Sequence, residues 1–320
     1  MERIRKSKHI CALLDTVADF DPTPNLTDPT PGAEAWMAFE WMDHSLVDFE
    51  HKYLKDHPWI LQIASRQILK ALGIYKEPNL IHTDLKHENI LVSNINSPEP
   101  IVKLADLGAT IPEGYNKDRI QLIAIRAPEV WRHKGGFHVS DVWSLGVTLT
   151  DCLLPVPIFG TRDNTLKIDP ECWCVAKIFR LFYQFPRPLH RLLQSEWELA
   201  AKLANPQYKY MEVGTMDDEL RKLELPEVIV DFVMSLLVVD DEKRPTAQEA
   251  LKHPFFQAKL EVPPDLCWKI GAEDHLSQGA SSSDQYSPGQ GEQIFLTSTL
   301  YLDREQSCLS MSYPHTSESV

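Results

Sequence analysis

The sequence predicts an α+β fold in which a few short strands precede a long run of helices. Strand-like apolar stretches occur at 10–20, 35–43, 90–93 and 101–106, and apolar residues at helical spacing dominate from 140 onward. Hydrophobic residues make up 43% and charged residues 24% of the 320 residues, which is the composition of a globular protein. Short strands in the first part of the chain and helices in the rest are the pattern of an α+β fold.

The first forty residues predict two strands joined by a loop. Residues 1–20 contain ICALLDTVADF, which is expected to form a short strand. Residues 21–32 are expected to form a loop, because their prolines remove backbone donors and their Asp and Asn residues favour turns. AWMAFEWMD, residues 35–43, is expected to be a buried strand with a polar exit.

A helix and a hairpin are predicted in the middle of the chain. Apolar residues recur at helical spacing from Asp56 to Tyr75, and Gly73 and Pro78 are expected to close this helix. ILVS at 90–93 and IVKLAD at 101–106 flank NINSPEP, a segment rich in turn formers. Two short strands around such a turn predict a β-hairpin.

The second half of the chain is predicted to be helical until residue 256. Ser140 is expected to be the N-cap of a long apolar helix that Pro155 and Pro157 end. Further helices are expected at 171–185, 190–204, 226–238 and 246–252. From Gln257 the sequence becomes rich in Ser, Gly and Gln, which predicts a disordered tail over 257–320.

Charge and cysteine content limit the function classes. A formal net charge of −14 argues against direct nucleic-acid binding and suits cationic partners, although it also serves solubility. Only Cys172 and Cys174 of the six cysteines stand close together, which indicates reduced, buried thiols rather than a zinc site. The first ten residues have no signal-peptide pattern, and Asp231 interrupts the longest apolar run. The sequence therefore predicts a protein of the cytoplasm or nucleus with no membrane partner.

One polar stretch, IHTDLKHENIL at 81–91, has the spacing of a phosphoryl-transfer site. Asp84 is followed two residues later by Lys86 and five residues later by Asn89. Phosphoryl transfer needs a carboxylate to orient the attacking hydroxyl, a cation near the phosphate and oxygen ligands for Mg²⁺. The predicted hairpin returns the chain so that Asp106, at the start of Asp-Leu-Gly, lies close to Asn89. The sequence thus predicts a phosphoryl-transfer site that binds Mg²⁺.

These motifs resemble those of the eukaryotic protein kinases. The resemblance rests on the catalytic-loop pattern at 82–89, Asp-Leu-Gly at 106–108, Ala-Pro-Glu at 127–129, Ser-Asp-Val-Trp-Ser-Leu-Gly at 140–146, Arg-Pro-Thr at 244–246 and His-Pro-Phe-Phe at 253–256. It covers roughly residues 9 to 256. It implies a protein-kinase-like fold, with a remnant of the β small lobe and hinge at 1–43 and an α-helical large lobe at 44–256.

The resemblance assigns chemical roles to four residues. Asp84 would orient and accept the proton of a Ser or Thr hydroxyl, and Lys86 would neutralise the transferring phosphoryl group. Asn89 and Asp106 would bind Mg²⁺. The alternative for Asp84 is a capping role, and for Lys86 a solvated surface lysine.

Further residues are assigned to the nucleotide pocket. Phe39 would back the adenine, and Glu40, Trp41 and Met42 would form the hinge, although plain core packing is an alternative for Trp and Met in an apolar run. Leu91 is also expected in the nucleotide site.

Structural roles follow from the same resemblance. His82 is expected to pack under the catalytic loop and Asp141 to hold its backbone from below. Glu129 and Arg244 are expected to form a buried ion pair.

The serine/arginine-protein kinases have the most similar motifs. They share His-Thr-Asp in the catalytic loop, a leucine in the metal motif and a segment like QLIAIRAPE at 121–129. This implies Arg/Ser-rich protein substrates, which the −14 charge would attract. Thr83 stands where many kinases have an arginine that binds the phosphate of a phosphorylated activation segment. Threonine cannot make the two parallel hydrogen bonds that a guanidinium group makes to phosphate. The segment 109–127 is therefore expected to be fixed by packing.

Two parts of the kinase pattern are absent from the sequence. Only Gly32 and Gly73 precede Asp84, so no Gly-rich loop is present, and no lysine follows a Val-Ala-Ile-like strand. The sequence is thus expected to be a truncated or degenerate kinase whose activity is impaired. The alternative functions are a catalytically inactive kinase-fold binding protein and a small-molecule phosphotransferase; Lys86 and Arg244 argue against the latter.

Overall fold

The chain folds into two units, which we describe separately. The computed structural model describes residue 4 and residues 6–17, 36–95, 97, 100–183, 185–260 and 294–298. Contacts assign Met1–Ala12 and Met42–Gly289 to the larger unit, and Leu13–Trp41 and Gln290–Val320 to the smaller one.

The smaller unit contains a three-stranded antiparallel sheet. Strand β2 (Trp36–Glu40) lies between β1 (Leu13–Val17) and β8 (Ile294–Ser298), with Thr16 opposite Met37 and Phe39 opposite Phe295. The prediction of a tail without regular structure was wrong at β8; the other residues from 261 on lie outside the described residues. A physical reason is that β2 paired with β1 alone would keep an open edge, which the apolar stretch from Ile294 covers.

The predicted domain boundary also changes, because residues 1–12 belong to the larger unit. Ile4 and Ile10 are buried in its core. The amide of Cys11 donates to the Leu104 carbonyl at 2.8 Å, and the Leu104 amide donates to the His9 carbonyl at 2.9 Å. This bridge binds the start of the chain to a strand of the larger unit, so it is not part of the sheet remnant that the sequence predicted.

The predicted hairpin is confirmed in the larger unit. Strands β5 (Ile90–Ser93) and β6 (Ile101–Leu104) pair antiparallel, with Ile90 opposite Leu104. The short strand β3 (His44–Ser45) adds to β5, and β4 (Leu80–Ile81) pairs with β7 (Ile111–Pro112). These small sheets carry the loops in which the polar motifs lie.

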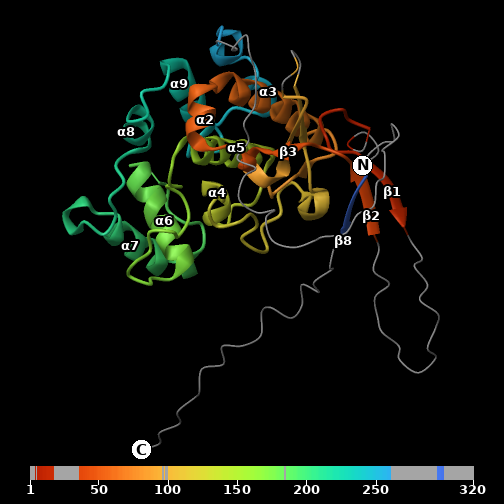
Figure 1. The fold of residues 1–320 in the computed structure, drawn as a ribbon. Coiled ribbons are helices and arrows are strands. Elements are labelled where there is room, and N and C mark those ends of the chain that lie inside the picture. The colour runs from red at the N-terminus through yellow and green to blue at the C-terminus, as the bar shows by residue number, and fades with distance from the viewer. Residues whose placement is uncertain are drawn as a thin grey trace, which may run out of the picture. The chain divides into compact units, whose positions relative to one another are not determined.

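Helices make up most of the larger unit (Figure 1). In chain order they are α2 (His51–Asp56), α3 (Pro58–Tyr75), α4 (Pro128–Trp131), α5 (His138–Leu153), α6 (Pro170–Leu181), α7 (Gln194–Leu203), α8 (Met216–Arg221), α9 (Glu227–Leu236) and α10 (Ala247–Ala250). Single-turn 3-10 helices occur at Leu46–Asp48, His87–Asn89, Leu107–Ala109, Arg191–Leu193, Pro206–Tyr208 and Pro254–Gln257. Within the described ranges, none of the helices has the length and apolar character needed to cross a membrane.

The start of α5 corrects one prediction. The helix begins at His138, with Phe137 at the N-cap, so Ser140 is inside the first turn. The Ser140 hydroxyl accepts the Phe137 amide at 2.9 Å and donates to Glu129. A serine at this position can satisfy an early amide by reaching back, so its presence did not locate the cap.

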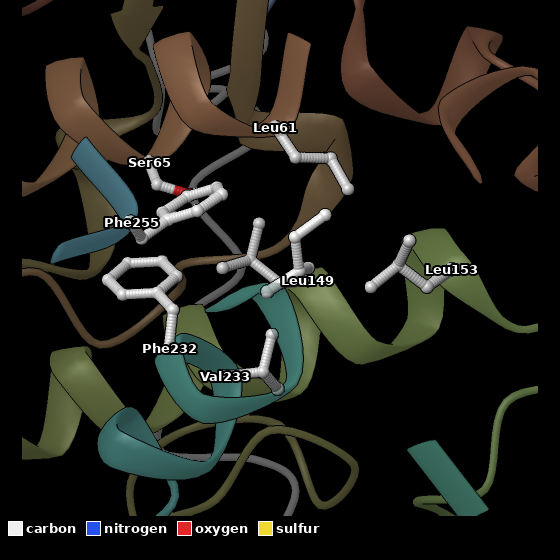
Figure 2. A pocket seen from close by; sticks show the side chains of 8 residues that line it. Leu61, Ser65, Leu149, Leu153, Phe232, Val233 and Phe255 are labelled. Atoms are coloured by element: carbon white, nitrogen blue, oxygen red, sulfur yellow. The ribbon is translucent and has the colours of Figure 1, made fainter. Parts of the chain in front are cut away.

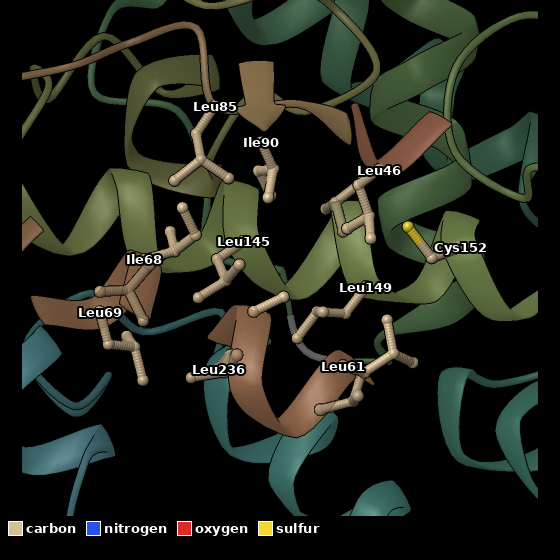
Figure 3. Close-up of a cluster of buried hydrophobic side chains, with 14 of the residues drawn as sticks. Leu46, Leu61, Ile68, Leu69, Leu85, Ile90, Leu145, Leu149, Cys152 and Leu236 are labelled. Carbon is tan, nitrogen blue, oxygen red and sulfur yellow. The ribbon is translucent and has the colours of Figure 1, made fainter. Parts of the chain in front are cut away.

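The core is formed where α3, α5 and α9 pack together with the β5–β6 hairpin. Figure 3 shows Ile68 of α3, Leu145 and Leu149 of α5, Ile90 of β5 and Leu236 of α9 in one cluster of buried side chains. A second cluster surrounds the contact between α6 and α7 and contains Trp131, Trp173, Phe185 and Trp197. Four cysteines are buried free thiols: Cys11, Cys152, Cys172 and Cys174.

One gap in this core contains a polar atom without a partner. Leu61, Ser65, Leu149, Phe232 and Phe255 are among the side chains that surround it (Figure 2). The gap has no room for a water molecule, and the buried Ser65 hydroxyl makes no hydrogen bond. Such a group lowers stability, because it has lost its hydration without gaining a partner.

Candidate active site

The structure brings the three polar residues of the catalytic-loop motif together. Lys86 Nζ donates to Asp84 Oδ2 at 2.8 Å. Asn89 Nδ2 donates to the Asp84 carbonyl at 2.8 Å and to its Oδ2 at 3.0 Å. One carboxylate oxygen therefore receives both a cationic and an amide donor, which fixes the orientation of the Asp84 side chain.

The backbone of this loop is held from beneath by Asp141 of α5. Its two carboxylate oxygens accept the amides of His82 and Thr83 at 2.7 and 2.9 Å. Asp141 is 1% exposed, and burial raises the pKa of its carboxyl group, although the two amide bonds favour the carboxylate. Thr83 has a positive φ of 68°, which is a strained conformation for a β-branched residue. Asp141 thus stabilises a backbone that would not persist alone.

His82 links the catalytic loop to the end of the β5–β6 hairpin. It is fully buried and edge-on to Tyr75, its Nδ1 accepts the Asp84 amide at 3.3 Å, and its Nε2 lies 2.9 Å from the Ala105 carbonyl. One ring nitrogen accepts and the other donates, so the neutral imidazole with the proton on Nε2 satisfies both contacts. This geometry agrees with the structural role expected for His82.

Asp106 leaves the β5–β6 hairpin beside Asn89. The preceding residue, Ala105, donates its amide to the Asn89 carbonyl at 2.9 Å. Asp106 is in the left-handed region at φ 58°, and its Oδ1 accepts the Gly108 amide at 3.1 Å. A Cβ on Gly108 would lie 3.1 Å from that same Oδ1, so a side chain there would crowd the carboxylate.

The donor set at this position suits magnesium when it is shared with a phosphate ligand. Among the described residues, no group of three or more His, Cys, Asp or Glu side chains could hold a metal ion. Mg²⁺, however, is commonly held by one or two carboxylates together with water and substrate phosphates. Asn89 uses its amide nitrogen toward Asp84, which leaves its oxygen for a cation, and the exposed Asp106 supplies a carboxylate. Asn89 and Asp106 therefore fit the ion that the sequence predicted.

The residues predicted for the adenine pocket are divided between the two units. Phe39 and Glu40 lie in β2 of the smaller unit, and Met42 lies in the larger one. Met42 Sδ accepts the Ser93 hydroxyl at 3.7 Å, and Leu91 pairs with Ser45. The hinge and nucleotide-binding roles of these residues stay predictions.

The expected pair of Glu129 and Arg244 is present. Arg244 donates through both terminal nitrogens to the two Glu129 oxygens at 2.8 and 2.9 Å, and both side chains are 0% exposed. Arg244 also donates to the carbonyls of Val139 and Val238 and lies over the Trp143 ring at 5.2 Å. The pair joins α4 to the loop before α10 and to the start of α5.

Sequence reasoning missed an arginine cluster in the segment 109–127. Arg126 and Arg119 both donate to Glu171 of α6, and Arg119 also makes a paired contact with Glu196 of α7. Both guanidinium groups lie over the Trp131 ring, at 4.3 and 5.1 Å. Burial acts to raise the pKa of Glu171, but the hydrogen bonds from the two arginines outweigh it and hold the pKa below its ordinary range.

This cluster gives a physical basis for the expected fixed segment. Gln121 strengthens it, since its Nε2 donates to Ser144 Oγ at 2.9 Å and its Oε1 accepts the Ala127 amide at 3.0 Å. The signal that was available in the sequence was Arg126, directly before Ala127-Pro128-Glu129, but its acidic partner lies 45 residues away.

Comparison with known proteins agrees with this geometry. The family described as "Protein kinase domain" matches residues 1–256. The chain belongs to the protein kinase family. The α+β fold predicted from the sequence is therefore the protein kinase fold, and the protein-kinase resemblance of the motifs is confirmed at the level of the family.

Individual protein kinases are similar at modest identity. Human "Cyclin-dependent kinase-like 2" is 29% identical over 241 residues, which cover 73% of this chain and 45% of that protein. "Dual specificity protein kinase lkh1" of Schizosaccharomyces pombe is 27% identical over 279 residues, which cover 78% of this chain and 36% of that protein. Human "Dual specificity protein kinase CLK1" is 25% identical over 275 residues, 72% of this chain and 54% of that protein. The chain thus spans about half or less of the length of these relatives.

Proposed function

We propose that this protein kinase transfers the γ-phosphate of ATP to a Ser or Thr hydroxyl of a protein substrate. The observation that carries the proposal is the contact of Asp84 Oδ2 with both Lys86 and Asn89, together with the amide bond that ties Ala105, next to Asp106, to Asn89. The four residues assigned to phosphoryl transfer thus come from one loop and the end of one hairpin.

Each side chain has a distinct task in the proposed reaction. Asp84, oriented by its two donors, accepts a hydrogen bond from the substrate hydroxyl and then its proton. Lys86 places a positive charge beside that carboxylate. This charge stabilises the negative charge of the phosphoryl group as it is transferred. Asn89 and Asp106 would hold Mg²⁺, which neutralises and positions the ATP phosphates when it is bound.

The proposed substrate is an Arg/Ser-rich protein. The support is the resemblance of 82–89 and 121–129 to the serine/arginine-protein kinases and the net charge of −14, which attracts cationic peptides. The words "dual specificity" in the names of two relatives make a tyrosine peptide a useful second substrate to compare. We also propose that the protein acts in the cytoplasm or nucleus, which imaging of a fluorescent fusion would test.

The test combines ATP binding with phosphate transfer by the purified chain. We expect Mg²⁺-dependent ATP binding and slow transfer to a Ser/Arg-repeat peptide, because the sequence has no Gly-rich loop and no strand lysine to hold the phosphates. Asp84→Asn should leave ATP affinity unchanged and slow transfer by about 10²–10⁴-fold. Asp56→Asn, at the exposed end of α2, is the matched control and should behave like wild type. ATP binding without transfer would favour the non-catalytic binding protein, and transfer by Asp84→Asn at the wild-type rate would refute the role of Asp84.

A further inference from the structure

A cleft on the larger unit is lined by residues that the proposed reaction does not use. Its volume is about 500 Å³, and its lining includes Lys8, Arg66, Gln67 and Lys103. A space of this size is in the range that binds a ligand or a short peptide segment. Its walls come from the start of the chain, the middle of α3 and the beginning of β6.

The cleft is strongly basic although the chain is acidic overall. Among the described residues that line it, three carry positive charge and none carries a carboxylate. Lys70 stands one helical turn after Arg66 on α3 and adds a fourth positive charge near the same wall. A local excess of positive charge in a chain of net charge −14 marks a surface suited to an anion.

The imidazole of His9 reports this local potential. Burial lowers the pKa of His9, and the positive charges of Lys70, Lys8 and Lys103 lower it further. The three lysines therefore act on one point within the cleft. Lys8 and Lys70 are both exposed, so these two cations face solvent.

The floor of the cleft is apolar, which adds a second requirement on the ligand. Ile63, Ile101 and Val102 line it, and Ile101 is 39% exposed. Arg66 fixes one wall, because it donates to the Phe256 carbonyl at 2.7 Å and lies over the Phe256 ring. A free phosphate ion would use the cations but not this floor, whereas a peptide with acidic and aliphatic side chains uses both.

We infer that this cleft docks an acidic, partly aliphatic peptide segment of a partner protein. Lys8 on the cleft and Lys70 beside it pair with carboxylates, and the floor around Ile63 and Ile101 receives aliphatic side chains. Nucleic acid is the less suitable anion, because the strongly acidic remainder of the chain repels a long polyphosphate. The docking surface would recruit a substrate or regulator independently of the phosphoryl-transfer residues.

The test is fluorescence anisotropy with the full chain and a short labelled peptide that alternates glutamate pairs with leucine. Lys8→Glu and Lys70→Glu should each weaken binding about tenfold, since each replaces an attractive charge with a repulsive one. The double variant should weaken it about 100-fold. Lys202→Glu is the matched control, an exposed lysine of α7, and should bind like wild type. Raising the salt concentration should weaken binding to wild type and have less effect on the double variant.

Several results would overturn the docking proposal. One is no binding of the peptide to the full chain, which would mean that the cleft has no affinity for acidic peptides. Another is that Lys202→Glu weakens peptide binding as much as Lys8→Glu or Lys70→Glu does, which would mean that binding depends on net charge and not on this cleft. A third is displacement of the peptide by single-stranded RNA at lower concentration than by unlabelled peptide. Because ATP binding and phosphate transfer are measured separately, failure here does not affect the proposed reaction.

Discussion

Replacing Glu129 or Arg244 should destabilise the larger unit strongly. Their two N–O contacts, at 2.8 and 2.9 Å, place the charge centres about 4 Å apart, where an effective dielectric of about 20 gives roughly 4 kcal/mol of attraction. Both side chains are 0% exposed, so the partner left behind would be charged, buried and unpaired. We therefore expect Glu129→Gln and Arg244→Met each to lower the free energy of unfolding by about 3–5 kcal/mol.

Urea unfolding followed by tryptophan fluorescence measures this effect. The double variant should lose about 1–3 kcal/mol less than the sum of the single variants, because removing both charges leaves none unpaired. Arg221→Met is the matched control: Arg221 pairs with Asp217 and Glu227 at an exposed position, and its loss should not move the midpoint measurably. Additive single losses, or a loss of less than about 1 kcal/mol for Glu129→Gln, would refute this reasoning.

Three further substitutions test other parts of the structure. Glu171→Gln should expose the segment 109–127 to trypsin, because its two arginines lose their shared carboxylate; unchanged cleavage would contradict the packing explanation. Asp151 has a buried, unpartnered oxygen, and burial raises its pKa to about 7. Because the folded state resists ionisation of this carboxyl group, the free energy of unfolding of the wild type falls as pH rises from about 4 to 7. Asp151→Asn cannot ionise, so it should be more stable than wild type at pH 8 by up to about 4 kcal/mol. Below about pH 4 it should have no advantage. A constant difference across this range in thermal melts would contradict it. Ser65→Ala removes a hydroxyl without a partner, so it should leave the free energy of unfolding unchanged or raise it by up to about 1 kcal/mol. Ser144→Ala removes a hydrogen-bonded hydroxyl and should lower it by about 1–2 kcal/mol in urea unfolding. Equal losses for the two variants would contradict this explanation.

Local patterns predicted the part of the site that is built from neighbouring residues. The positions of Asp84, Lys86 and Asn89 lie within one loop, and the turn-rich segment before residue 101 predicted the hairpin that brings Asp106 back. Short loops and hairpins are determined by residues close in sequence, so spacing alone carries their geometry. The pairing of Glu129 with Arg244, by contrast, was available only through resemblance to a family.

The sequence did not predict the contacts that depend on tertiary packing. Arg119 meets Glu196 across 77 residues, and β8 pairs with β2 although more than 250 residues separate them in the chain. The residues next to Arg119 or to β8 in the sequence give no sign of these partners. The packing of α6 and α7 brings Glu196 to Arg119, and the open edge of β2 brings β8 to β2. The start of α5 was misplaced for a similar reason, since Ser140 is compatible both with a cap and with a first-turn position.

The central claim is that Asp84 and Asp106 flank one magnesium–nucleotide site. A crystal structure of the chain with Mn²⁺ and ADP, using the anomalous signal of manganese to locate the ion, tests it directly. We expect the ion at about 2.1 Å from oxygens of both Asn89 and Asp106, with the Asp84 carboxylate facing the same space. An ion bound elsewhere, or Asp84 and Asp106 turned away from each other with the nucleotide bound, would contradict the claim.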